Sequence, residues 1–310
     1  MAFLHSRKLI VLSLVVMILL ASASLLYLFK KDYIMEAWSA YTLPPELKKA
    51  TFISMQENTT TLLSVSGARF KKEVLKGVLI SADEREQNTA QIILDENGVY
   101  NIFLNRKNIY ATSSPLAGVS VSPDGTMVAY AHGTTPLMPL EVPQLIPNSS
   151  FDSRAWSVTV LSLASGALLE VGAGAAPLFI DSTNLLHFAP GGVFITDVRA
   201  QKKNFVLPGV FINATVSTLQ SPDRTLVGWK DSFSNTVTIY RVSVNGLEKV
   251  ADMTNTGAGS HTLGNDALYR TYRSIYGGGI MKQGFGETEA YKVGFLPSLY
   301  PITRLSLGSI

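Results

Sequence analysis

The chain has 310 residues, enough for one large or two ordinary domains, with 26 basic and 23 acidic residues, 4 histidines and no cysteine. The absence of cysteine excludes disulfides, thiolate metal sites and cysteine nucleophiles. Four basic residues, Arg7, Lys8, Lys30 and Lys31, flank an N-terminal apolar run, and the other 22 nearly balance the 23 acidic ones. We therefore expect no nucleic-acid partner.

The first predicted element is an apolar helix over residues 9–29, a run without charged side chains. At 1.5 Å per residue this run spans about 30 Å, the thickness of the hydrocarbon core of a bilayer. We predict a transmembrane signal-anchor helix, with residues 1–8 as a short cytoplasmic tail and the C-terminal domain outside the cytoplasm. The alternative is a signal peptide cleaved near Ala21-Ser22-Ala23, which would leave a secreted or periplasmic protein.

Residues 30–50 are predicted to be a juxtamembrane linker. Within it Met35, Ala37, Trp38 and Tyr41 could form a short amphipathic turn at the membrane interface, which Pro44-Pro45 would end. The sequence does not decide between a plain linker and an amphipathic turn at the membrane interface.

Residues 51–310 contain a unit that recurs about every 40 residues. Residues 119–131 read VSVSPDGTMVAYA and residues 218–230 read TLQSPDRTLVGWK, each a strand, a Ser-Pro-Asp turn and a second strand. A fixed period of this size indicates a stacked or radial repeat. An aspartate marks each turn, where its carboxylate can accept local backbone N–H groups. These predicted turn residues are Asp83, Asp124, Asp181, Asp223 and Asp266.

Each unit reads as four strands, because alternating apolar and polar residues continue after the turn, as in TVTIYRVSV at 236–244. The first three strands of the domain, within 51–75, lack an innermost partner, while residues 299–307 form a strand with nothing after it. Joining the two ends completes one unit and removes open sheet edges. We predict an all-β domain, a six-bladed β-propeller of four-stranded blades.

The turns at 122–125 (Ser-Pro-Asp-Gly) and 221–223 (Ser-Pro-Asp) resemble the WD40-like repeats of TolB-type proteins, often called PD40 repeats. That resemblance implies a six-bladed propeller outside the cytoplasm. It carries no catalytic residue and no partner. The match covers two of the six units, since the turns at Asp83, Asp181 and Asp266 lack the proline and the glycine.

One interval is longer than the rest, because a proline-rich loop is inserted at 133–154. Prolines every three or four residues enforce an extended backbone, and the apolar residues between them need a surface to cover. The loop is either a lid over its own propeller face or a partner-docking element. The candidate docking residues are Leu137, Met138, Leu140, Val142, Leu145 and Ile146.

No motif for catalysis, metal binding or cofactor binding is found, so we assign no catalytic, cofactor or metal residue. His5, His132, His187 and His261 are spread along the chain, and core or rim positions explain them as well as a channel site does.

The leading functional hypothesis is a membrane-anchored extracytoplasmic propeller that serves as a protein-interaction or assembly platform in the envelope, without catalysis. One alternative is a lactonase-like or quinoprotein-like propeller enzyme with a site on the central channel. The other is a carbohydrate or cell-wall binder, which predicts exposed aromatic residues on one face. Fold alone does not decide among them.

Overall fold

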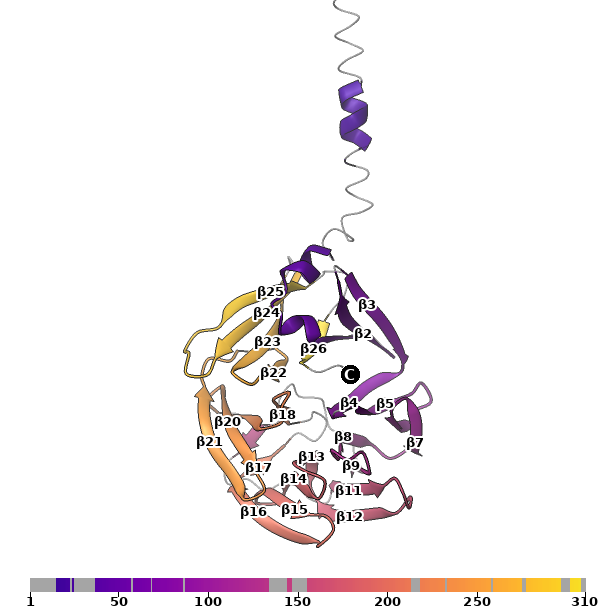
Figure 1. The fold of residues 1–310 in the computed structure, drawn as a ribbon, viewed down its shortest axis with the longest axis vertical. Coiled ribbons are helices and arrows are strands. Elements are labelled where there is room, and N and C mark those ends of the chain that lie inside the picture. Colours follow the sequence, from indigo (N-terminus) through magenta and orange to yellow (C-terminus); the bar gives the residue numbers. More distant parts are fainter. Residues whose placement is uncertain are drawn as a thin grey trace, which may run out of the picture.

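The computed structural model describes residues 15–22, 24, 37–133 except 57, 68 and 86, 144–146, 155–212, 218–296 except 232, 258, 275 and 276, and 302–307. Six antiparallel four-stranded units are arranged around a central channel (Figure 1). We number them as blades 1 to 6 in the order in which their second strands occur in the chain. The predicted all-β six-bladed propeller is confirmed.

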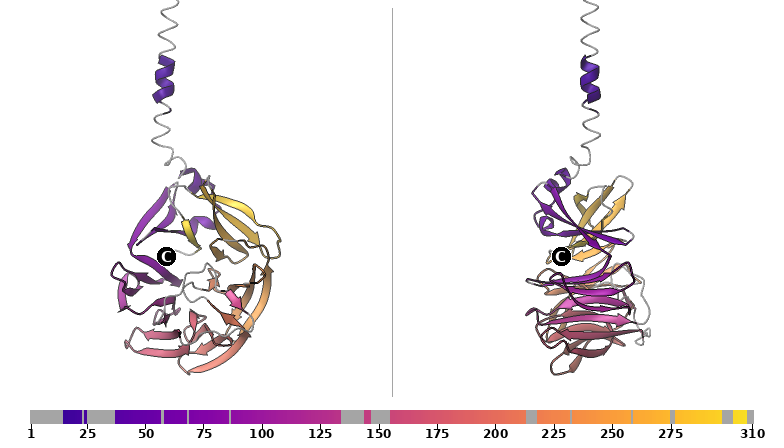
Figure 2. Two further views of the ribbon diagram at one scale, coloured as in Figure 1. Left: turned by 180° about the vertical axis from the view of Figure 1, so that it is seen from behind. Right: turned by 90° about the vertical axis from the view of Figure 1, so that its right-hand side faces the viewer.

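Each blade runs from an innermost strand at the channel to an outermost strand at the rim (Figures 1 and 2). Blade 1 comprises β26 (Ile302–Ser306), β1 (Thr51–Gln56), β2 (Thr59–Ser66) and β3 (Arg69–Lys76). Blade 2 comprises β4 (Val78–Arg85), β5 (Asn88–Leu94), β6 (Tyr100–Leu104) and β7 (Lys107–Thr112). Blade 3 comprises β8 (Leu116–Val121), β9 (Met127–Gly133), β11 (Trp156–Ser162) and β12 (Leu168–Ala173).

Blade 4 comprises β13 (Ala175–Phe179), β14 (Asn184–Ala189), β15 (Gly192–Asp197) and β16 (Lys202–Pro208). Blade 5 comprises β18 (Leu219–Gln220), β19 (Leu226–Asp231), β20 (Thr236–Ser243) and β21 (Gly246–Met253). Blade 6 comprises β22 (His261–Leu263), β23 (Ala267–Ser274), β24 (Gly277–Gly284) and β25 (Tyr291–Leu296). Two short strands, β10 (Gln144–Ile146) and β17 (Val210–Phe211), lie outside this scheme and join blade 5.

The two ends of the domain close the ring as expected. β26 pairs antiparallel with β1, with Phe52 opposite Leu305, and so supplies the innermost strand that blade 1 lacks. The hydrophobic core is divided into layers between neighbouring blades. Between blades 4 and 5, for example, Phe188 stacks on Phe211 at 4.0 Å between ring centroids and meets Trp229 edge-on at 5.5 Å. Because each blade packs against a neighbour on both of its faces, strands of moderate hydrophobicity bury enough apolar surface to hold the blades together.

Residues 37–50, part of the predicted linker, pack against the propeller. Residues 37–42 are helical and lead to the 3-10 turn η1 (Leu47–Lys49). Ala40, Leu43 and Leu47 are fully or almost fully buried in the layer between blades 1 and 6. The physical reason is the hydrophobic effect, because these apolar side chains leave water for the layer formed by blades 1 and 6. This part of the chain is thus an element of the folded domain.

Of the predicted transmembrane segment 9–29, the structure describes only residues 15–22 and 24, which are helical. In the described part of the chain, no helix has both the length and the apolar character needed to cross a membrane.

Replacing Leu305 by alanine is expected to destabilise the whole propeller, because this side chain is 6 % exposed and packs in the layer that closes the ring. Large-to-small substitutions of this kind cost about 2–4 kcal/mol. Urea unfolding of the full chain measures the loss. The same change at Leu168, which is 53 % exposed, is the matched control and should stay within about 0.5 kcal/mol of the parent. If the two substitutions lowered the free energy of unfolding equally, Leu305 would not lie in a buried layer that closes the ring.

Candidate functional site in the central channel

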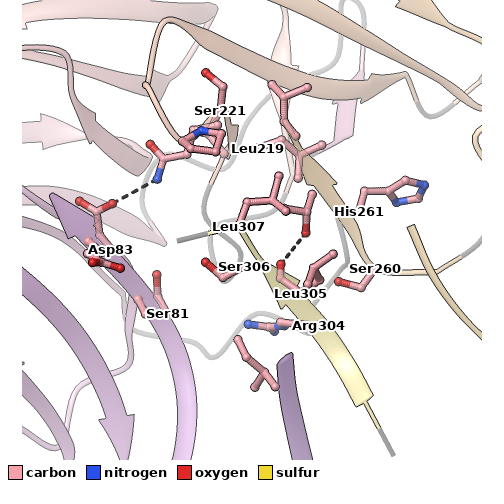
Figure 3. A pocket seen from close by; sticks show the side chains of 18 of the residues that line it. Ser81, Asp83, Leu219, Ser221, Ser260, His261, Arg304, Leu305, Ser306 and Leu307 are labelled. Atoms are coloured by element: carbon pink, nitrogen blue, oxygen red, sulfur yellow. Dashed lines mark hydrogen bonds between the residues drawn. The ribbon is translucent and has the colours of Figure 1, made fainter. Parts of the chain in front are cut away.

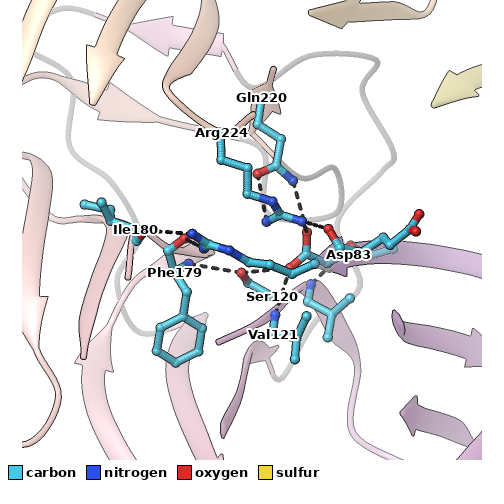
Figure 4. Close-up of polar contacts among 11 residues, drawn as sticks. Asp83, Ser120, Val121, Phe179, Ile180, Gln220 and Arg224 are labelled. Atoms are coloured by element: carbon cyan, nitrogen blue, oxygen red, sulfur yellow. Dashed lines mark hydrogen bonds and ion pairs between the residues drawn. The ribbon is translucent and has the colours of Figure 1, made fainter. Parts of the chain in front are cut away.

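A buried carboxylate, that of Asp83, lies at the channel in β4 of blade 2 (Figure 4). One of its oxygens accepts hydrogen bonds from Ser120 Oγ at 3.0 Å and from the Val121 backbone N–H at 2.8 Å. The other accepts from Gln220 Nε2 at 3.1 Å and forms an ion pair with Arg224 at 2.6 Å. These donors come from blades 3 and 5, so a single side chain of blade 2 joins three blades.

Arg224 reaches Asp83 from an unusual backbone conformation. Its φ is +61°, in the left-handed region that favours glycine. Gly125, with φ +66°, holds the corresponding place in the turn of blade 3. A non-glycine residue there costs roughly 1–2 kcal/mol. The Arg224 guanidinium offsets this cost by its ion pair with Asp83 and by hydrogen bonds that it donates to Gln220 Oε1 at 3.2 Å and to the Glu84 carbonyl. The Arg224 side chain is only 10 % exposed.

A second arginine extends the network to blade 4. Arg85, at the end of β4, donates to the backbone carbonyls of Phe179 at 2.5 Å and Ile180 at 2.8 Å. Ser120, which donates to Asp83, also accepts from the Phe179 N–H at 3.0 Å. Blades 2, 3, 4 and 5 are therefore connected by one continuous set of buried and partly buried polar contacts (Figure 4).

Beside this network lies a cavity of about 310 Å³. Its walls come from the channel-facing segments of blades 1, 2, 5 and 6, and Figure 3 shows Ser81, Ser260, Arg304 and Ser306 around it. Several polar groups of the walls hold the blades together. Ser81 Oγ accepts from the Val119 N–H at 3.1 Å, and Arg304 donates to the Ile80 carbonyl at 3.3 Å. The cavity has the size and polarity to take a small polar molecule.

His261 lines the same cavity and is 4 % exposed. Burial lowers the pKa of its imidazole to about 4, with Lys230 and Arg270 acting in the same direction. At neutral pH the ring is therefore uncharged. Its Nε2 lies 3.2 Å from the Thr256 carbonyl, which can only accept, so Nε2 carries the proton. Nδ1 is then a buried acceptor that has no hydrogen-bond partner among the described residues.

The predicted turn aspartates divide into two groups. Asp124, Asp181 and Asp223 lie in turns and accept local hydrogen bonds, for example from Ser122 Oγ to Asp124 at 2.6 Å and from the Thr183 N–H to Asp181 at 2.7 Å. Partial burial opposes ionisation of these three carboxyls, but the hydrogen bonds prevail and lower their pKa values. Their short local contacts fit a structural role.

The other two aspartates differ from this pattern. Asp266 lies in the bend before β23, and its carboxylate faces Lys282 Nζ at 3.4 Å. The prediction for Asp83 is wrong: it lies within β4 and not in a turn, and its carboxylate contacts other blades. One feature of the sequence could have indicated this contact. The turn that reads Ser-Pro-Asp-Gly at 122–125 reads Ser-Pro-Asp-Arg at 221–224, so a long basic side chain, Arg224, replaces the glycine and needs an acidic partner.

The proline-rich loop reaches a different blade from the one it leaves. Within 134–154 the structure describes only β10, which pairs parallel with β19 and antiparallel with β17 of blade 5. The Leu145 side chain packs in the layer between blades 4 and 5, over Gly209, where an added Cβ would come within 2.2 Å of a Leu145 methyl carbon. The other docking candidates, Leu137, Met138, Leu140 and Val142, lie outside the described residues, and Ile146 is described only by its backbone.

The three histidines that the structure describes lie in different blades, and His5 lies outside the described residues. His132 lies in β9, His187 in β14 and His261 in β22, in blades 3, 4 and 6. Across the described residues, no group of three or more histidine, aspartate and glutamate side chains could hold a metal ion.

Of the comparisons with known proteins, the one with solved structures supports the fold. No protein-family profile matches the sequence, and no curated protein matches it significantly. Among solved structures, a chain of a nidogen/laminin complex is similar with a TM-score of 0.52 and 8 % identity, over 83 % of this chain and 97 % of that one. TolB from Acinetobacter baumannii is similar with a TM-score of 0.40 and 12 % identity, over 80 % of this chain and 70 % of that one. At 8 % identity, the likeness to the chain of the nidogen/laminin complex concerns the fold alone.

Replacing Arg224 by glycine is expected to lower stability by about 2–4 kcal/mol. Breaking a buried ion pair costs more than relief of the left-handed backbone returns. The double variant Arg224→Gly/Asp83→Asn should lose about 1–3 kcal/mol less free energy of unfolding than the two single variants lose together. Urea unfolding of all four proteins gives this coupling.

Arg106 provides the matched control, because it has φ +69° but an exposed ion pair with Glu73. The free energy of unfolding of Arg106→Gly should be unchanged or slightly higher. A loss at Arg106 as large as at Arg224 would refute the role of the buried pair.

The free energy of unfolding is expected to fall as the pH drops from 7 to 5. The folded-state pKa of His261 is about 4, below the unfolded value near 6.5, so below pH 6.5 the unfolded state binds the proton that the folded state excludes. This difference amounts to about 2 kcal/mol at pH 5. Urea unfolding at the two pH values should show a smaller drop for His261→Gln. An unchanged pH dependence would exclude a buried, neutral His261.

Proposed function

We propose that this protein is a membrane-anchored, extracytoplasmic β-propeller that serves as a protein-interaction platform. The anchor is the apolar segment 9–29. In its described part the side chains of residues 15–20 are between 46 % and 63 % exposed, so this apolar helical stretch has no protein core to cover it. An environment of lipid would cover it.

The observation that carries the platform role is the state of the Asp83 carboxylate. A catalytic acid or base needs an oxygen that can meet a substrate. Both oxygens of Asp83 are instead occupied by donors from blades 3 and 5, within an ion pair that is almost fully buried. The carboxylate in the channel therefore holds blades in place and favours a rigid scaffold over an enzyme.

The insertion 133–154 supplies the element that we propose docks a partner. Leu145 fixes its middle to blade 5, and Leu137, Met138, Leu140 and Val142 precede that fixed point. A segment tied down at one residue loses less conformational entropy on binding than a free loop does. In this proposal Leu145 positions the loop, and the four preceding apolar residues make the contact.

The two alternatives have unequal support. Trp156 and Trp229 are 3 % and 1 % exposed, so neither can stack on carbohydrate. The exposed aromatic side chains of the blades, Phe205, Phe233 and Tyr291, are spread over blades 4, 5 and 6. The cavity beside His261 is the feature that favours a channel enzyme, as a site for a small polar substrate. A substrate there would contact serine hydroxyls and the neutral imidazole.

Site-specific photo-crosslinking in the native cell tests the platform. A photoreactive residue at 137 or 140 of the full chain should capture one defined envelope protein, and the same residue at Phe233, which is 77 % exposed, should not. The purified partner should then bind the parent chain at fixed stoichiometry and bind Leu137→Ser/Leu140→Ser at least tenfold more weakly.

Capture of the same proteins at Phe233 as at 137 and 140 would argue against a specific docking loop. A C-terminal tag digested by protease only after the membrane of sealed, right-side-out vesicles is opened would place the propeller in the cytoplasm and refute its proposed location.

A further inference from the structure

The outer surface of residues 37–50 combines exposed aromatic and basic side chains. While Ala40 and Leu43 are buried against blades 1 and 6, Trp38 is 45 % exposed and Tyr41 is 77 % exposed. Lys48 follows in η1, with its ammonium 5.9 Å from the Tyr41 ring centroid, and Lys49 is also exposed. Figure 1 shows this segment next to blades 1 and 6, with its helical part at the rim of the propeller.

The neighbouring outermost strand of blade 1 is basic as well. In β3, Lys72 and Lys76 are exposed on the side that carries Phe70, which packs in the same layer as Ala40 and Leu43. Arg69 and Lys71 are exposed on the other side of the strand, where Glu73 pairs with Arg106 of blade 2. Exposed lysines also protect an edge strand from pairing with other chains. That role accounts for the lysines of β3 but not for Trp38 and Tyr41, which are on a helical segment.

Tryptophan, tyrosine and lysine together are the residue types enriched at membrane–water interfaces, where the rings lie among the headgroups and the ammonium groups meet lipid phosphates. Basic clusters next to a membrane segment bind anionic lipids through their charge. The chain length also limits the distance to the bilayer. The eight residue steps from Phe29 to Ala37 reach at most about 28 Å.

We propose that the rim surface formed by Trp38, Tyr41, Lys48, Lys49 and the β3 lysines Lys72 and Lys76 rests on the bilayer and binds anionic lipid headgroups. This inference rests on the proposed membrane anchor and adds an orientation to it. The propeller stands with the junction of blades 1 and 6 against the membrane. The junction of blades 3 and 4, on the opposite side of the ring, then points away from the bilayer and is open to partners.

Fluorescence of the full chain in vesicles tests this contact. Trp156 and Trp229 are buried within blades, so a nitroxide on the lipid headgroup should quench mainly Trp38. We expect at least twofold stronger quenching in vesicles containing 30 % phosphatidylglycerol than in pure phosphatidylcholine. Trp38→Phe should abolish this difference, and circular dichroism checks that the variant is folded.

Charge variants separate lipid binding from mere proximity. Lys48→Gln/Lys49→Gln should remove most of the dependence on anionic lipid. The matched control is Lys202→Gln/Lys203→Gln on β16 of blade 4, which should leave the dependence intact. Equal loss in both variants would mean that net charge and not this surface is responsible, which would overturn the proposal.

Alkaline carbonate extraction of the same vesicles distinguishes failure of this inference from failure of the anchor. A chain that resists extraction but shows no headgroup quenching of Trp38 keeps the anchor and overturns the membrane-contact surface. A chain that carbonate removes has no spanning anchor, and that result overturns both proposals.

Discussion

The antiparallel pairing of β26 with β1 is the constraint on which the rest of the molecule depends, because it joins the last described strand to the first. Each hydrophobic layer lies between two blades, so an open ring would leave the layer between blades 1 and 6 half exposed. The same layer receives Ala40, Leu43 and Leu47 from the segment that precedes β1. Ring closure and docking of the N-terminal segment are therefore one packing event.

Closure also fixes the channel, where polar contacts replace apolar ones. The innermost strands approach from all sides, so backbone groups and short polar side chains there need partners. Asp83, Arg85 and Arg224 supply them across blades 2 to 5. Arg224 adopts a left-handed conformation to do so, and local strain is tolerated because the buried charge of Asp83 requires a cation.

The two proposed interaction surfaces arise where the chain departs from the repeat. The insertion is fixed to blade 5 through Leu145 and Gly209, and the N-terminal segment is fixed to blades 1 and 6. In the proposed orientation, one surface faces lipid, while β10, the described strand of the insertion, pairs with blade 5. A rigid ring suits this arrangement, since it holds a membrane contact and a docking element at a constant separation.

The sequence by itself determined the blade count, the strand pattern and the closure by the chain ends, because each unit encodes its alternating strands locally and the units recur about every 40 residues. Only the tertiary structure decided the role of Asp83, whose partners Ser120, Gln220 and Arg224 are 37 to 141 positions away in the chain. It likewise decided the pairing of β10 with blade 5 and the packing of residues 37–50. Such contacts depend on which blades the ring brings together, and no local pattern of residues records that geometry.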